Sequence, residues 1–189
     1  MRILITGGAG FIGSNLVKHF AGKGSEVVVL DNFSTGFKEN LQGLDAKIIE
    51  ASVANERVLS KACSEVDCIL HLAGIVGVPL SVQKPVETIE ANVISTLRLL
   101  EAAHNAGVKR VVFPSSASVY GSNQSLPLKE DSLPAPLSPY ALTKSSCEHL
   151  MKMYYKQHGL ETVCLRLFNA YGPRQKPTSF YAAVIPAFI

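Results

Sequence analysis

The sequence is short of charged blocks, basic clusters and long apolar segments. Charged residues make up 17% of the 189 residues, and the 18 lysines and arginines are scattered among 15 acidic residues. The absence of a basic run with interleaved aromatic residues argues against nucleic acid as a partner. No apolar run approaches the roughly 20 residues that a membrane-spanning helix needs. We therefore expect neither a nucleic-acid nor a membrane partner.

Cysteines are also few, and their spacing is not that of a metal site. Cys63, Cys68, Cys147 and Cys164 lack the close pairs that are typical of structural zinc. They lie in segments expected to be helices or strands, as reduced and buried thiols do. The first strand-like segment starts at Arg2, which leaves no room for a signal peptide. We expect no bound metal and a cytoplasmic location.

A glycine-rich segment joins the first predicted strand to the first predicted helix. Residues 2–6 form a short apolar run, residues 7–13 contain four glycines, and residues 14–22 have helical spacing of apolar side chains. Strand, glycine turn and helix in this order are the context that a dinucleotide fingerprint requires. Glycines let the backbone approach a pyrophosphate, which the helix N-terminus then faces. The alternative is a structural turn that binds no phosphate.

A carboxylate follows the second predicted strand, which covers residues 26–30. Asp31 lies about 20 residues beyond the glycines, where an acidic residue hydrogen-bonds the adenosine ribose of a dinucleotide. Its negative charge would repel a 2′-phosphate, so Asp31 favours NAD over NADP. The alternative is an ordinary surface aspartate.

Tyr140 and Lys144 are four residues apart in a helix predicted over 138–158. Ser138 suits the cap and Pro139 the first helical position, so the pair should lie in the first turn. Residues i and i+4 share a helix face. A nearby cation lowers the pKa of a phenol from about 10, and such a phenol can take and return an alcohol proton. Taken alone, however, most such pairs are surface neighbours.

Predicted strands and helices alternate along the whole chain. A hydrophobic content of 47% and the length indicate one globular domain over 1–189. Alternation predicts an α/β fold, a doubly wound parallel sheet of the Rossmann type with helices on both faces. Ligands of such sheets bind beyond the carboxyl ends of the strands. The other predicted strands are 46–50, 67–72, 109–114 and 162–168, and the other predicted helices are 55–62 and 85–106.

Motifs at these strand ends resemble those of a known family. They lie at 6–13, 31–36, 71–74, 81–85, 92–93, 115–121 and 165–175, with the Tyr140 and Lys144 pair between the last two. The chain is similar throughout to the extended short-chain dehydrogenases/reductases of the NAD-dependent epimerase/dehydratase family. Within that family it resembles the UDP-sugar 4-epimerases, for UDP-glucose/UDP-galactose or N-acetyl forms.

The resemblance implies roles for individual residues. Ser116, Tyr140 and Lys144 would be catalytic: the serine binds the reacting sugar oxygen, the tyrosine is the acid/base, and the lysine holds the nicotinamide ribose. Ser116, Tyr140 and Asn169 would contact the substrate. His71 is interpreted as a packing residue. The residues expected to bind NAD are Gly7, Gly10, Phe11, Ile12, Gly13, Asp31, Asn32, Ser34, Thr35, Gly36, Ser52, Val53, Leu72, Ala73, Gly74, Asn92, Ser115, Tyr140, Lys144 and Phe168.

The implied reaction is epimerisation of a UDP-sugar, by oxidation at C4 and re-reduction from the other face. Family dehydratases carry an Asp-Glu pair just after the active-site hydroxyl residue, where this chain has Ala117 and Ser118, which disfavours water elimination. Another nucleotide-sugar oxidoreductase or decarboxylase stays open, as does a non-catalytic NAD-binding module or fragment. Relatives also form homodimers through helices corresponding to 85–106 and 138–158, which should pack on one sheet face.

Three departures from the family pattern stand out. Ser52 replaces a common aspartate at the adenine, and Val76 replaces a lysine that some bacterial epimerases carry near the nicotinamide. The chain also stops at Ile189, so the family's C-terminal substrate domain is largely absent. Residues 169–189 are expected to begin that substrate-binding part, and 182–189 to be helical.

Overall fold

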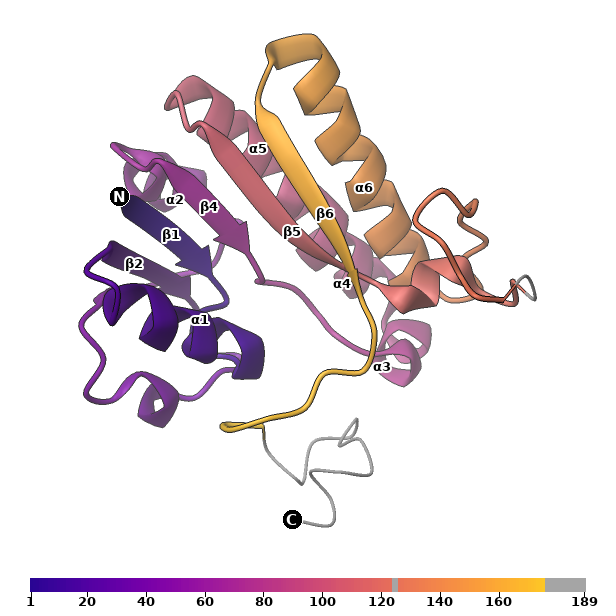
Figure 1. The fold of residues 1–189 in the computed structure, drawn as a ribbon, viewed down its shortest axis with the longest axis horizontal. Helices are drawn as coiled ribbons and strands as arrows, with labels where there is room; N and C mark the ends of the chain where they lie inside the picture. Colours follow the sequence, from indigo (N-terminus) through magenta and orange to yellow (C-terminus); the bar gives the residue numbers. More distant parts are fainter. Residues whose placement is uncertain (124–125, 176–189) are drawn as a thin grey trace.

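Six parallel strands form the centre of the computed structural model, which describes residues 1–123 and 126–175. The sheet order is β3-β2-β1-β4-β5-β6, so the strand order reverses beside the central strand β1 (Figure 1). This confirms the doubly wound parallel sheet. The predicted helix at 182–189 lies outside the described residues. The strands are β1 (Arg2–Thr6), β2 (Glu26–Asp31), β3 (Lys47–Glu50), β4 (Cys68–His71), β5 (Arg110–Ser116) and β6 (Glu161–Leu167).

Helices connect the strands and cover the two faces of the sheet unequally. On one face α2, α5 and α6 share a hydrophobic core that includes Leu99, Cys147 and Met151. The expectation that the helices around 85–106 and 138–158 pack on one face is therefore confirmed. On the other face α1 packs through Val17 on Ile5 and neighbouring side chains. The helices are α1 (Phe11–Ala21), α2 (Glu56–Cys63), α3 (Val78–Gln83), α4 (Pro85–Ile89), α5 (Ser95–Asn105) and α6 (Pro139–His158), with short 3-10 turns η1 (Lys38–Leu41) and η3 (Ala117–Tyr120).

The segment predicted as one helix over 85–106 is divided in the structure. A π-helical turn, η2 (Glu90–Ile94), separates α4 from α5. The hydroxyl of Ser95 donates to the carbonyl of Glu90, five residues earlier, at 3.2 Å. The wider turn places Asn92 toward the sheet, where its amide contacts the loop after β4. A hydrophobic repeat alone does not reveal such an insertion.

On the face of β5 and β6 opposite α6, no helix of the described residues covers the strands. Side chains of β6 alternate, and Val163 and Leu165 on that face are 38% and 47% exposed. In Figure 1 no described helix lies in front of these two strands. None of the helices in residues 1–123 and 126–175 is long and apolar enough to cross a membrane.

Candidate active site

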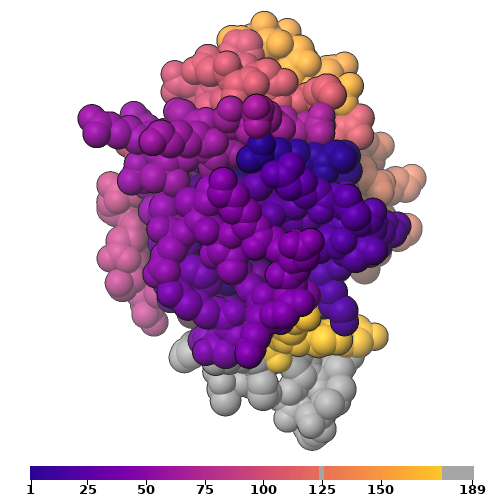
Figure 2. All heavy atoms as spheres, turned by 90° about the vertical axis from the view of Figure 1, so that its left-hand side faces the viewer, coloured from indigo at the N-terminus to yellow at the C-terminus, as the bar shows by residue number. Residues whose placement is uncertain are grey.

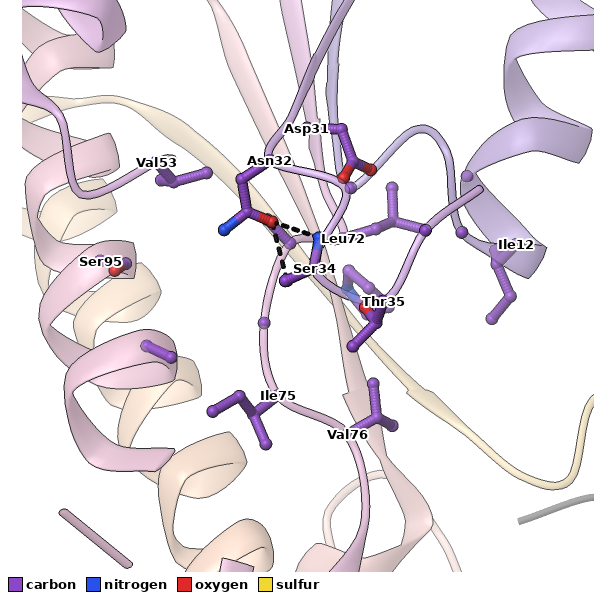
Figure 3. A pocket seen from close by; sticks show the side chains of 18 of the residues that line it. Ile12, Asp31, Asn32, Ser34, Thr35, Val53, Leu72, Ile75, Val76 and Ser95 are labelled. Atoms are coloured by element: carbon purple, nitrogen blue, oxygen red, sulfur yellow. Dashed lines mark hydrogen bonds between the residues drawn. The ribbon is translucent and has the colours of Figure 1, made fainter. Parts of the chain in front are cut away.

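A cavity of about 990 Å³ lies beyond the carboxyl ends of the strands, where the strand order reverses (Figure 3). It extends from the turn after β1 to the first turn of α6. Of the residues proposed from the sequence, all but Asn92 line its wall. The cavity thus brings together the glycine turn, the strand-end residues Asp31, Ser52 and Ala73, and the residues after β5 and β6.

The glycines of the first turn have different reasons to be glycine. Gly7 has a φ of +68°, and a Cβ there would lie 2.7 Å from the backbone nitrogen of Ala73. A Cβ on Gly13 would overlap the carbonyl oxygen of Gly7. Gly10, by contrast, has only that oxygen nearby, at 3.3 Å. Gly7 and Gly13 therefore serve packing, and Gly10 leaves open space beside the cavity.

Helix α1 begins at this open space without a side-chain cap. Gly10 is its N-cap, and no side chain caps this end of the helix. The N–H groups at a helix start are an anion site, because they point outward and carry partial positive charge. An uncapped helix start next to a glycine facing a cavity fits the pyrophosphate of a dinucleotide.

Asp31 stands at the end of β2, 8% exposed and lining the cavity (Figure 3). One carboxylate oxygen accepts from the backbone N–H of Ala9 at 2.9 Å, and the other from that of Phe33 at 2.8 Å. The carboxylate therefore holds the glycine turn in place. Each oxygen keeps a further lone pair with which it can accept from a ribose hydroxyl. Asn32 beside it accepts from the backbone and hydroxyl of Ser34, which shapes the same wall.

Tyr140 and Lys144 lie in the first two turns of α6, and both line the cavity. The cap predicted from the sequence is present: the hydroxyl of Ser138 accepts from the N–H of Ala141 at 3.1 Å. The Lys144 ammonium lies 5.8 Å from the centroid of the Tyr140 ring. Ser116 lines the same cavity, and its oxygen accepts from the N–H and hydroxyl of Ser118. The three residues proposed as catalytic thus share one wall.

The surroundings of Lys144 are unusually dry for a lysine. Its ammonium donates to the carbonyl of Pro114 at 2.8 Å and lies 4.5 Å from the centroid of the Phe113 ring. Burial lowers the pKa of Lys144 to about 8. A lysine whose pKa is near neutrality can respond to small changes in charge beside it.

Asn92 lies behind the cavity wall, not in it. Its amide oxygen accepts from the N–H of Ile75 at 2.7 Å, and its amide nitrogen donates to the carbonyl of Ile75 at 3.0 Å. The same nitrogen donates to the hydroxyl of Thr143 in α6 at 3.1 Å. Asn92 therefore fastens the loop after β4, and with it Val76, to the helix that carries Tyr140.

His71 belongs to the same buried layer. One ring nitrogen is 2.8 Å from the hydroxyl of Thr6 and the other 3.0 Å from that of Thr96. Burial and the nearby Lys144 ammonium lower the pKa of His71 to about 3, so the ring is neutral at pH 7. This placement agrees with its interpretation as a packing residue.

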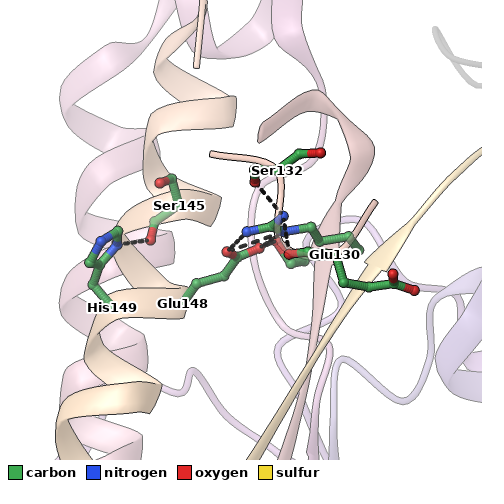
Figure 4. A network of polar contacts seen from close by, with 7 residues as sticks. Glu130, Ser132, Ser145, Glu148 and His149 are labelled. Atoms are coloured by element: carbon green, nitrogen blue, oxygen red, sulfur yellow. Dashed lines mark hydrogen bonds and ion pairs between the residues drawn. The ribbon is translucent and has the colours of Figure 1, made fainter. Parts of the chain in front are cut away.

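An ion pair that contacts Ser115 was not predicted from the sequence (Figure 4). Arg166 of β6 forms a bidentate pair with Glu148 of α6, with its shortest contact at 2.8 Å. The same guanidinium donates to the carbonyls of Glu130 and Ser132 in the loop before α6. Ser115 also donates to Glu148, so its hydroxyl serves this network while the residue lines the cavity.

Part of the wall comes from residues that the sequence did not indicate. Ile75 lies below Asn32 in Figure 3, next to Val76, which the sequence indicated only as a departure from the family pattern, and α5 contributes Ser95. Arg98 reaches from α5 to the carbonyl of Ala54. Ser95 and Arg98 lie on α5, so the rule that directs attention to strand ends could not find them. The other unpredicted wall residues are Leu30, Ala51, Ala54, Glu87, Glu90, Ala91, Ile94, Pro114, Leu167 and Ala170.

Comparisons with known proteins agree with this geometry. The sequence model of the NAD dependent epimerase/dehydratase family matches residues 3–189. The solved UDP-glucose 4-epimerase of Thermotoga maritima with UDP-glucose is 38% identical with a TM-score of 0.94, over 100% of this chain and 62% of that one. The Thermus thermophilus UDP-glucose 4-epimerase complex with NAD is 38% identical with a TM-score of 0.90, over 95% of this chain and 59% of that one.

A curated relative has a different reaction in its name. The UDP-N-acetyl-alpha-D-glucosaminuronate decarboxylase of Bacillus cytotoxicus is 39% identical over 197 residues, which cover 100% of this chain and 60% of that protein. The chain spans about half to three fifths of the length of the curated relatives that it matches first.

Proposed function

Since the chain belongs to the NAD dependent epimerase/dehydratase family, we propose that its cavity binds NAD and that the protein is a UDP-sugar 4-epimerase. In this proposal residues 1–189 are the NAD-binding domain, and residues 169–189 begin the substrate-binding part. One arrangement supports this proposal above all. Tyr140, Lys144 and Ser116 share a cavity with the uncapped start of α1.

NAD, when bound, supplies reversible two-electron oxidation at the sugar carbon. The Tyr140 phenol takes the proton from the C4 hydroxyl and later returns it, as a positioned general acid/base does. Ser116 positions the sugar oxygen, and Asn169 contacts the substrate near its phosphates. The Lys144 ammonium favours phenolate at Tyr140 because it places positive charge beside that ring. Asp31 accepts from the adenosine ribose and disfavours a 2′-phosphate.

The residues after Ser116 favour epimerisation over dehydration. Elimination of water needs an acid and a base beside the sugar, and the family's dehydratases carry an Asp-Glu pair there. At this place the chain has Ala117 and Ser118, and the Ser118 hydroxyl donates to Ser116 at 2.9 Å. A second candidate is a nucleotide-sugar decarboxylase, which the 39% identity to the Bacillus cytotoxicus protein favours.

A cytoplasmic homodimer is part of the same proposal. Val86 of α4 and Leu142 of α6 are 67% and 50% exposed. These helices pack against each other, so their exposed apolar side chains can meet a second copy. Burial of such a face would stabilise the pair through the hydrophobic effect.

The first experiment is calorimetric titration of the 189-residue chain with NAD and with NADP. We expect NAD to bind more tightly, because the carboxylate of Asp31 repels a 2′-phosphate. Equal or tighter NADP binding would contradict the role given to Asp31.

The second experiment uses this chain in a longer form that includes the C-terminal part present in its relatives. Tyr140→Phe should keep NAD affinity but lower epimerase turnover by roughly 10² to 10⁴, the usual effect of losing a general acid/base. Tyr155→Phe is the matched control, because Tyr155 lies on the same helix and is 57% exposed. Equal turnover in both variants would remove Tyr140 from the mechanism, and release of carbon dioxide from a UDP-uronic acid would favour the decarboxylase.

A further inference from the structure

The chain that follows β6 is fastened across the first turns of α1. We call residues 168–175 the strap. Phe168, Asn169 and Ala170 line the same cavity as Gly10 and Gly13. Beyond them the chain crosses toward α1 (Figure 1), and in Figure 2 its yellow end emerges against the indigo and purple N-terminal half. The strap thus connects the two halves of the sheet across the cavity.

Three contacts tie residues 172–174 of the strap to the first turns of α1. The amide nitrogen of Asn15 donates to the carbonyl of Pro173 at 2.9 Å. The guanidinium of Arg174 donates to the carbonyl of Ser14 at 3.4 Å. Gly172 lies beside the ring of Phe11, where a Cβ would come within 3.6 Å of it. Asn15 makes the shorter of the two hydrogen bonds and is therefore the main candidate for a fastening residue.

Asn15 is an unusual residue for the interior of a helix. Asparagine is a weak helix former because its amide competes for backbone hydrogen bonds. Here the amide nitrogen also donates to the carbonyl of Phe11, one turn earlier, at 2.9 Å. Its two N–H donors therefore have one carbonyl each. The side chain is held by its own helix in the orientation that reaches the strap.

We propose that Asn15 is a positioning residue that sets how long the cofactor stays bound, by holding the strap closed over the cavity. The inference rests on the proposed function, in which this cavity binds NAD. Release requires space between the strap and the glycine turn, so opening of the strap precedes it. Loss of one net hydrogen bond shifts an equilibrium roughly fivefold, and the release rate should increase by about that factor.

The test is the release rate of NADH from the 189-residue chain, followed by stopped-flow fluorescence with excess NAD as competitor. Asn15→Ala should release NADH roughly fivefold faster. Asn15→Asp should be faster still, because a carboxylate would face two carbonyl oxygens. Asn15→His keeps an N–H donor and should restore slow release. Asn105→Ala, at the exposed end of α5, is the matched control and should release NADH as the wild type does.

A second variant separates positioning from folding. Arg174→Ala removes the other hydrogen bond from a residue outside any helix or strand. It should also speed the release of NADH. The double variant should release NADH faster than either single variant, but its acceleration should be smaller than the product of the two single accelerations, because both bonds close the same strap. If Asn15 served only the stability of α1, its variants would lower the melting temperature of the cofactor-free chain and leave release unchanged.

The possible failures are distinguishable. An unchanged release rate in Asn15→Ala and Arg174→Ala, with NADH still bound, would overturn the strap and leave the cofactor site in place. Fast release in Asn15→His as well as in Asn15→Ala would also overturn it, because the donor would then be irrelevant. A wild-type chain that binds no NADH would overturn both this inference and the proposed function.

Discussion

Replacing Lys144 with methionine should stabilise the cofactor-free protein while weakening its binding of NAD. Burial lowers the pKa of this lysine from 10.5 to about 8. Below pH 8 the ammonium is charged in both the folded and the unfolded chain, but only the folded chain removes it from water. The difference between the two pKa values corresponds to about 3 kcal/mol of unfolding free energy.

The expected gain is smaller than this figure, because the lysine also makes a hydrogen bond. Without the ammonium, the carbonyl of Pro114 loses a donor at 2.8 Å, which costs about 1 kcal/mol. Methionine has a similar length and fills the space beside Phe113. Lys144→Met should therefore raise the unfolding free energy by about 2 kcal/mol at neutral pH.

The dependence on pH identifies the cause. A folded-state pKa below the unfolded-state pKa means that the unfolded chain binds more protons between about pH 8 and 10.5. Wild-type stability should rise over that range, since the slope follows the protons taken up on unfolding. The advantage of Lys144→Met should be complete below pH 8 and should disappear by pH 10.5.

Urea unfolding of both proteins from neutral pH to pH 10.5 measures this directly. Lys152→Met is the matched control, because Lys152 is an exposed lysine on the same helix, and we expect little change. A Lys144→Met protein that is less stable at neutral pH would refute the reasoning. So would a gain that does not shrink as the pH rises.

Two further predictions concern the glycine turn and the ion pair. Gly10→Ala should abolish NAD binding but change unfolding free energy by less than about 1 kcal/mol, whereas Gly13→Ala should lower it by more than about 2 kcal/mol, since only the second Cβ would overlap backbone. Calorimetry and thermal unfolding of both variants would expose a reversed order. Burial raises the pKa of Glu148, but hydrogen bonds from Arg166 and Ser115 outweigh it and hold that pKa below 4.5. The stability that this carboxylate contributes is present above pH 4.5 and lost as the pH falls through the folded-state pKa. Glu148→Gln should therefore show a shallower loss of stability below pH 4.5, and an unchanged acid limb would count against the network.

Local patterns in the sequence predicted a parallel sheet and the order of its strands and helices along the chain. The strand expected over 162–168 is β6, Glu161–Leu167, and the helix expected over 138–158 is α6, Pro139–His158. Apolar runs rich in β-branched residues specify such strands, and the serine cap with its following proline specifies the helix start. Glycine positions are equally local, since a positive φ such as that of Gly7 depends on the turn itself.

Features that depend on distant partners could not be predicted in this way. Helix α3 has six residues and begins next to Gly77, which has a φ of +117°, so its sequence resembles a loop. Arg166 and Glu148 lie on different elements and meet only when α6 packs on β6. Asn92 was expected at the cofactor because of its motif, but a motif does not give the direction of a side chain. Its amide is directed to Ile75 and Thr143.

The central position of β1 has a consequence for the order in which the parts of the sheet can form during synthesis. Ile3 pairs with Val27 on one side and with Cys68 on the other. A nascent chain can therefore complete one edge of β1 after about the first 30 residues, but the second edge only after β4 has left the ribosome. The glycine turn and Asp31 belong to the part made first, and Tyr140 comes much later. Since domains begin to fold during synthesis, we expect the part of the cavity around the glycine turn and Asp31 to take shape while Tyr140 is still untranslated.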